Sequence, residues 1–288
     1  MVTEVFRDGM HVSMEFSKGI PKTKLTIIGE TDKKGTLQTF LPDKEIFMDT
    51  DFSFKTIIDH LRQQAYLTKS LKIKCIDERN EKLIEFNFYF QGGIGSFVRS
   101  VTSTKPIISS PFYIEKEIDD YKVEVAINYV DDYNEHIYCF ANNINTKEGG
   151  THLTGFRTAL TRCINDYAKS QNILKPNDPP INGEDIKEGL VTIVSVKLPD
   201  PQFEGQTKSK LGNPEMSKAV FSTVFEHLTY WLNENPADAR KIIEKVLLSA
   251  RARMAAKAAR ETVIRKGALD GLTLPGKLAD CSNRDPSK

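Results

Sequence analysis

A run of mostly apolar residues from Leu190 to Leu198, followed at once by Pro199-Asp200-Pro201, constrains the fold of this chain more than any other feature. An apolar stretch of this length is typical of a buried strand. Each proline lacks a backbone N–H donor and fixes φ, so the prolines end the strand. The sequence therefore predicts a buried strand that leads into an exposed loop, residues 199–212.

The loop carries Gln206 and Lys208, two residues apart. In extended backbone, residues i and i+2 point to the same side, so an amide donor and an ammonium group would project together. Such a pair suits a terminal phosphate. The alternative is an ordinary solvated basic loop, because Lys208 and Lys210 alone would be unremarkable on a surface.

Composition limits the class of protein. The 288 residues suffice for two domains with their own cores, and 39% hydrophobic and 27% charged residues are ordinary for a soluble globular protein. No apolar run is long enough for a membrane span, and no signal segment is expected. The four cysteines form no CxxC pair, which argues against a zinc site or a disulfide framework and fits a reducing cytoplasm.

Charge is unevenly distributed although the net charge is only +1. Residues 111–135 contain eight acids and two lysines, whereas residues 237–266 contain nine basic residues and three acids. Such asymmetry can mark a face that meets nucleic acid, and a solvated basic helix explains it equally well.

The hydrophobic pattern predicts an α+β chain. Alternating or continuous apolar runs predict strands near 14–16, 25–28, 37–41, 71–76, 83–90, 112–118, 121–129, 137–141 and 190–198. Helical spacing predicts helices over 54–67, after Gly149-Gly150 with Thr151 as N-cap, after Asn213-Pro214, and from Asn235-Pro236 onwards. The last helix has no Gly or Pro over 237–266 and should stop at Gly267 or Gly271; we expect it to join units rather than fill a core.

The loop at 199–212 resembles the switch loop of type IIA DNA topoisomerases, whose glutamine and lysine reach the γ-phosphate of ATP. Four more stretches resemble the same family, in the order found in its bacterial gyrase B branch: Gly29–Thr36, Phe140–Thr146, Gly149–His152 and Leu274–Cys281. The resemblance covers essentially the whole chain.

This resemblance implies a domain organisation. Residues 1–90 would be the C-terminal part of a GHKL-type ATPase domain, and residues 91–262 a transducer domain with the ribosomal S5 domain 2-like fold and long C-terminal helices. Residues 263–288 would lead into a Toprim domain outside this chain. The family's catalytic glutamate, magnesium-binding asparagine and glycine-rich lid would lie upstream, so the chain alone is expected to be inactive.

The resemblance also implies roles for individual residues. Gln206 and Lys208 would contact the γ-phosphate, and Gly35-Thr36 would lie at the adenine end of the pocket, with the Thr36 hydroxyl on a base-bridging water. Arg7 would lie at the pocket rim. The alternative for Gly35-Thr36 is an ordinary turn between strands, and the alternative for Arg7 is an ordinary charged residue on the surface.

A second set of residues concerns DNA. Arg157 would line a cavity that receives DNA and contact its phosphates, whereas Arg162 is expected to face solvent or pair with an acid. His152 is expected to be a structural hydrogen-bonding residue, and no metal site is assigned to this chain.

The implied activity is that of one subunit of an ATP-dependent type II topoisomerase, which couples ATP binding and hydrolysis to DNA strand passage and negative supercoiling in the cytoplasm. The implied cofactor is ATP with Mg²⁺, whose ligands lie outside this chain. Implied partners are double-stranded DNA, the gyrase A protein in an assembly of two A and two B subunits, and a second copy of gyrase B on ATP binding. Alternatives are the B subunit of topoisomerase IV, a non-topoisomerase GHKL ATPase, and a module that only binds DNA through residues 237–266.

Overall fold

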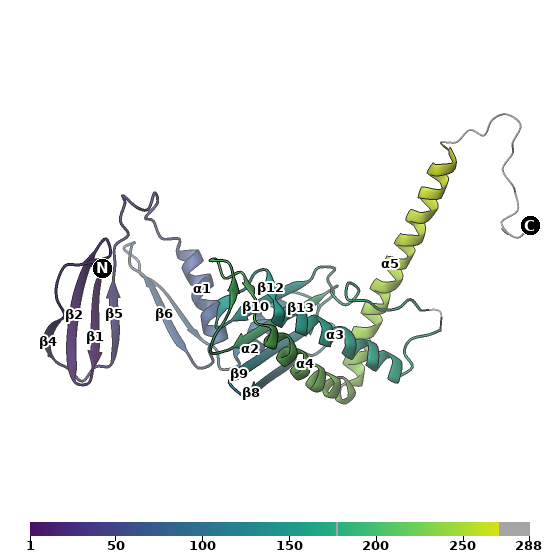
Figure 1. Cartoon of the computed structure of the whole chain (residues 1–288), viewed down its shortest axis with the longest axis horizontal. Helices are drawn as coiled ribbons and strands as arrows, with labels where there is room; N and C mark the ends of the chain where they lie inside the picture. The colour runs from purple at the N-terminus through teal and green to yellow at the C-terminus, as the bar shows by residue number, and fades with distance from the viewer. Residues whose placement is uncertain (177, 271–288) are drawn as a thin grey trace, which may run out of the picture. The chain divides into compact units, whose positions relative to one another are not determined.

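The computed structural model describes residues 1–176 and 178–270 (Figure 1). The Leu274–Cys281 motif lies outside the described residues, as does most of the predicted 263–288 linker. The chain divides into two compact units, Met1–Ile58 and a second unit that begins at Asp59. The predicted domain bounds 1–90, 91–262 and 263–288 stay predictions. Among the described residues, no helix is both long enough and apolar enough to span a bilayer.

The first unit is an antiparallel sheet. Its strands are β1 (Val2–Arg7), β2 (Met10–Ser17), β3 (Ile20–Pro21), β4 (Thr26–Glu30) and β5 (Gly35–Thr39). The order is β3-β2-β1-β5, with β4 also paired to β2. Strand β1 was not predicted, although Asp8-Gly9 after it is a strong hairpin signal; both residues have positive φ, as a tight two-residue turn requires. Helix α1 (Phe54–Leu67) has the predicted bounds.

The second unit is built on a mixed five-stranded sheet. The sheet contains β8 (Phe112–Ile118), β9 (Tyr121–Tyr129), β10 (His136–Ala141), β11 (Ile144–Asn145) and β13 (Leu190–Lys197). The order is β11-β10-β13-β9-β8, with β13 parallel to β10 and antiparallel to β9. The buried strand predicted at 190–198 is thus confirmed, and it is the central strand.

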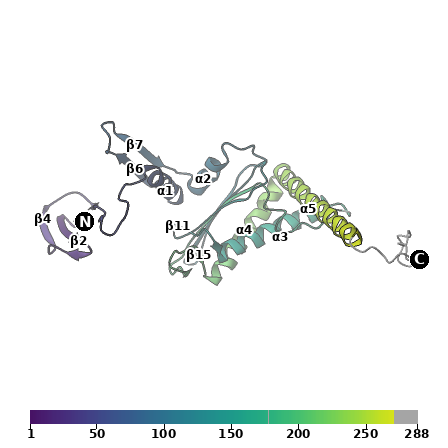
Figure 2. The same ribbon diagram turned by 90° about the horizontal axis from the view of Figure 1, so that it is seen from above.

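Helices cover both faces of this sheet. Helices α3 (Thr151–Ser170) and α4 (Pro214–Glu234) lie side by side on one face (Figure 2). On the other face, α2 (Gly93–Thr102) and the C-terminal end of α1 pack in a smaller cluster. Helix α2 was not predicted, although its apolar residues Ile94, Phe97 and Val98 recur at helical spacing. The hairpin of β6 (Lys72–Asp77) and β7 (Ile84–Tyr89) was predicted.

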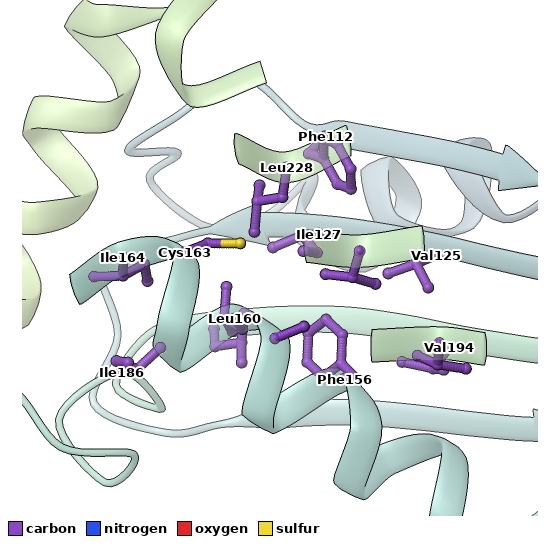
Figure 3. Close-up of a cluster of buried hydrophobic side chains, with 14 of the residues drawn as sticks. Phe112, Val125, Ile127, Phe156, Leu160, Cys163, Ile164, Ile186, Val194 and Leu228 are labelled. Carbon is purple, nitrogen blue, oxygen red and sulfur yellow. The ribbon is translucent and has the colours of Figure 1, made fainter. Parts of the chain in front are cut away.

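The larger core lies between α3, α4 and the sheet. Phe156 and Leu160 on α3 point toward Val125, Ile127 and Val194 on the sheet (Figure 3). All five side chains are buried, and each contributes roughly 1.5–3 kcal/mol relative to an exposed position.

The predicted helix caps differ from those observed. Thr151 is the first residue of α3 rather than its N-cap; Gly150 precedes the helix and has no side chain to cap it. Asn213 precedes α4 and Pro214 begins it, as predicted, but the Asn213 side chain makes no cap bond. It bonds to the preceding loop and to the Glu215 side chain in the first turn of α4.

Helix α5 (Pro236–Asp270) starts at the predicted signal and passes through Gly267 to Asp270, the last described residue; the predicted stop at Gly271 lies outside the described residues. The expectation that it would not fill a core is wrong for its first half. There Ala239, Ile242, Ile243, Val246 and Leu247 are buried in the larger core, because they form one helical stripe. From Arg251 to Thr262 only Arg253 is partly buried.

Candidate phosphate-contacting hairpin

A short hairpin carries Gln206 and Lys208 in the second unit. Strands β14 (Phe203–Glu204) and β15 (Lys210–Leu211) pair antiparallel, and β15 also pairs in parallel with β12 (Gly149–Gly150). Residues 205–209 form the connection, so Gln206 and Lys208 lie at its tip and are exposed.

The backbone at the tip is not extended, which corrects our expectation. Gln206 and Thr207 form a turn that begins at Gly205, and Lys208 has φ +53°. The Lys208 N–H donates to the Gly205 carbonyl at 3.4 Å. The chain must reverse within five residues, so the same-side rule for residues i and i+2 does not apply here. The two residues share the exposed tip of the hairpin because of the turn, and not because of strand geometry.

Lys208 is the free cation of this hairpin. Its ammonium group lies 5.8 Å from the centre of the Phe203 ring, and no carboxylate in the described part of the chain lies within 4 Å of it. Lys210, by contrast, forms an ion pair with Glu204 at 3.1 Å. An unpaired ammonium can neutralise the negative charge of a phosphate, and an exposed amide can donate a hydrogen bond to it.

Arg7, Gly35 and Thr36 lie together in the first unit. Strands β1 and β5 pair Phe6 with Gly35 and Val5 with Thr36, and Arg7 follows Phe6. Gly35 has φ +140°, a conformation that favours glycine. The Arg7 side chain is 81% exposed and pairs with Asp8 at 3.3 Å, a surface pair that contributes little to stability.

Arg157 lies on α3 in a polar groove of the second unit. Its Nη2 donates to Glu135 Oε2 at 2.9 Å, whereas Arg157 Nε and Glu135 Oε1 are buried with no hydrogen-bond partner among the described residues. Two cavities of about 350 and 210 Å³ both include Arg157, Leu153 and Glu148 in their walls. An anion that binds Arg157 must therefore compete with Glu135.

The remaining basic and histidine residues behave as structural groups. Arg162 pairs with Asp166 at 3.5 Å, in line with the expected local pair. His152 is buried, its Nε2 lies 3.2 Å from Thr146 Oγ1, and burial lowers its pKa to about 4. On α5, three basic side chains are already paired with acids: Lys245 with Asp131, Arg251 with Asp178 and Arg253 with Asp185.

The segment that contains the central sheet, α3 and the hairpin is the part of the chain that a family model recognises. The model described as DNA gyrase B matches residues 93–262, more than half of the chain. The chain belongs to the DNA gyrase B family.

Similar proteins agree with this membership. The DNA gyrase B protein of Halalkalibacterium halodurans is 49% identical over 286 residues, which cover 99% of this chain and 45% of that protein. The chain thus spans about half the length of this curated relative. The ATPase domain of Thermus thermophilus gyrase B, solved with an aminocoumarin, is 42% identical with a TM-score of 0.75, over 91% of this chain and 71% of that one.

A topoisomerase IV structure is also similar. The ATP-binding domain of Francisella tularensis topoisomerase IV, solved with a small-molecule inhibitor, is 29% identical with a TM-score of 0.76, over 88% of this chain and 69% of that one. These likenesses confirm the predicted family and the α+β fold class with its ATPase-domain architecture.

Proposed function

We propose that the chain is part of the ATP-dependent gyrase B protein, and that it couples nucleotide state to DNA strand passage and negative supercoiling. The observation that carries the proposal is the tip of the β14–β15 hairpin, where Gln206 and Lys208 are both exposed and Lys208 has no acidic partner among the described residues. Membership of the DNA gyrase B family supports the terminal phosphate of ATP as the ligand of that tip.

When bound, ATP would supply a γ-phosphate that carries negative charge. Lys208 neutralises this charge, and Gln206 donates a hydrogen bond to it. Thr36 and Gly35 serve the adenine end of the pocket, with Arg7 at its rim. The Mg²⁺ that accompanies ATP is held by residues outside this chain.

Loss of the γ-phosphate would release the hairpin, and this differential contact provides the conformational signal. DNA is the partner of the Arg157 groove, through sequence-independent phosphate contacts whose affinity falls with salt. The larger assembly contains the gyrase A protein and, with ATP bound, a second copy of gyrase B, in the cytoplasm.

A second candidate is the B subunit of topoisomerase IV, favoured by the likeness to the Francisella domain. The match to the DNA gyrase B family model supports gyrase over it. Negative supercoiling by the assembled enzyme separates the two, because only gyrase introduces it. A non-topoisomerase GHKL ATPase would not supercoil DNA, and a simple DNA-binding module would bind DNA indifferently to nucleotide.

Nucleotide affinity tests the proposed phosphate contact. The test uses a gyrase B protein that contains this chain and the rest of the ATP site. In it, Lys208→Ala should lower the affinity for a non-hydrolysable ATP analogue about 10- to 100-fold, because a charge-assisted hydrogen bond is lost. ADP affinity should not change, since ADP has no γ-phosphate. Lys210→Ala is the matched control, because Lys210 is paired with Glu204. Equal analogue affinity in the Lys208→Ala and Lys210→Ala proteins would contradict the proposal.

The 288 residues alone are expected to hydrolyse no ATP and cleave no DNA, because the family's catalytic groups are not among them. Steady-state phosphate release from the purified chain checks this. Turnover that persists in the Lys208→Ala variant after stringent purification would contradict it.

A further inference from the structure

We propose that Asn142 and Asn213 are positioning residues that fix the base of the β14–β15 hairpin and thereby the orientation of Gln206 and Lys208. The inference rests on the proposed γ-phosphate contact. It concerns the two ends of the 199–212 loop, which the two prolines exclude from the sheet ladder.

Asn142 fixes the beginning of the loop. Its Nδ2 donates to the Leu198 carbonyl at 2.8 Å, and its Oδ1 accepts from the Leu198 N–H at 2.9 Å. The Asn142 backbone N–H donates to Val196 O at 2.9 Å. The side-chain amide thus extends the ladder one residue beyond β13, at the last backbone N–H before Pro199.

Asn213 fixes the return of the loop. Its Oδ1 accepts from the Gln202 N–H at 2.6 Å, and its Nδ2 donates to the Asp200 carbonyl at 3.1 Å. The Asn213 side chain is buried, and the Gly212 N–H closes the same turn by donating to Gln202 O at 2.7 Å. Its Nδ2 also donates to Glu215 Oε1 in the first turn of α4 at 2.7 Å, so the side chain ties the loop to the start of the helix without making an N-cap bond.

The strands of the hairpin are also attached to the core, since Leu211 is buried in the larger core and Phe203 packs against it. Strand β15 pairs with only two residues of β12, and Glu148 bonds to Ser209 through a backbone N–H and a side-chain oxygen. Because this ladder is short, the bonds at the base of the hairpin help to set the direction of its tip. Loss of the side-chain hydrogen bonds of either asparagine should therefore let the tip move while the core beneath it stays packed.

The dipeptide Asn142-Asn143 offers a matched control. Both residues have positive φ, +49° and +64°, so glycine fits either position without backbone strain. Their side chains serve different partners, since Asn143 Nδ2 donates to Thr68 Oγ1 at 3.0 Å and not to the loop. Asn142→Gly and Asn143→Gly therefore differ mainly in the contact to Leu198.

Hydrogen exchange of the full chain measures the positioning directly. Asn142→Gly and Asn213→Ala should each speed amide exchange of the 199–212 peptide about tenfold, with α3 and α4 unchanged, because a local contact is lost. Asn143→Gly should leave that peptide unchanged. If Asn142→Gly fails to fold by Trp231 fluorescence, Asn142→Asp replaces it, because it keeps the acceptor for Leu198 and loses the donor. Unchanged exchange in the folded variants would overturn the inference.

Nucleotide affinity then separates positioning from simple stability. In the gyrase B protein with a complete ATP site, Asn142→Gly should lower the affinity for the non-hydrolysable ATP analogue about tenfold and leave the affinity for ADP unchanged. A general loss of stability would lower both affinities. Faster loop exchange with normal analogue affinity would overturn the positioning role, provided that Lys208→Ala weakens the analogue. If Lys208→Ala has no effect either, the proposed phosphate contact fails and the positioning role fails with it.

Discussion

Among single residues, Gly150 is the most tightly constrained position beside the hairpin. A Cβ there would lie 2.2 Å from the Leu211 carbonyl oxygen, and φ is +131°. Gly205 is a matched control, because it also has positive φ (+72°) but nothing within 4 Å of the added carbon. Gly150→Ala should lower the free energy of unfolding by about 3 kcal/mol or more, and Gly205→Ala by about 1 kcal/mol. Urea unfolding followed by Trp231 fluorescence measures both; equal effects would contradict the steric account.

Burial of His152 predicts that the stability of the fold depends on pH. Burial holds its folded-state pKa at about 4, below the ordinary value of 6.5. Between these values the unfolded state binds a proton and the folded state does not, so stability falls as pH drops from about 6.5 to 4. The loss should be about 2–3 kcal/mol at pH 4 relative to pH 7.

His152→Gln should remove most of this pH dependence, whereas replacement of the exposed His60 should leave it intact. Trp231-detected urea unfolding at a series of pH values is the measurement. An identical pH slope in the His152→Gln protein would contradict the assignment.

Among the elements, α5 is attached to the rest of the second unit by an ion pair with a buried carboxylate, which the apolar pattern of the helix does not predict. Asp185 is buried and accepts from Arg253 through both oxygens, at 2.7 and 3.0 Å. Arg253→Met should cost about 2 kcal/mol of unfolding free energy, because it leaves a buried carboxylate short of a partner. Arg251→Met, whose side chain is about half exposed opposite Asp178, should cost less than about 1 kcal/mol. Equal costs by urea unfolding would argue against a special role for Asp185.

Most long elements followed from the sequence, because their apolar periodicity is strong. The hairpin around Asp119-Asp120, helix α1 and central strand β13 were all predicted. The two-residue strands β12, β14 and β15 were not. Strand β12 pairs with β15 about 60 positions away, and local propensity has no signal for such a contact. Strands β14 and β15 pair locally across residues 205–209, but two residues are too few for a periodic pattern, and the tip between them was wrongly expected to be extended.

The sequence predicted which residues form the candidate site, but it did not predict the residues that hold the loop in place. Family resemblance named Gln206 and Lys208, but the Asn213-Pro214 start signal assigned Asn213 the ordinary role of a helix cap, and its side chain makes no cap bond. Its contacts to Asp200 and Gln202 depend on how the loop folds back, which no local pattern states.

For the whole molecule, exposed apolar surface on the first unit predicts self-association. Large side chains that remain exposed there are Ile20, Leu25, Ile27, Ile28, Leu37, Phe40, Leu41, Ile46, Phe47, Met48 and Phe52. Several of them line a hollow of about 700 Å³. Such patches bind hydrophobic dyes and promote aggregation. The 288-residue chain should scatter light as oligomers, whereas residues 59–288 should be largely monomeric. A monodisperse monomer of the whole chain would contradict this prediction.

The most direct test of the central claim is a supercoiling assay on relaxed plasmid with the gyrase B protein that carries this chain and its gyrase A partner. We expect ATP-dependent negative supercoiling, lost in Lys208→Ala and retained in Lys210→Ala. Relaxation without supercoiling would assign the chain to a topoisomerase IV-like enzyme, and full supercoiling by the Lys208→Ala protein would contradict the role given to the hairpin.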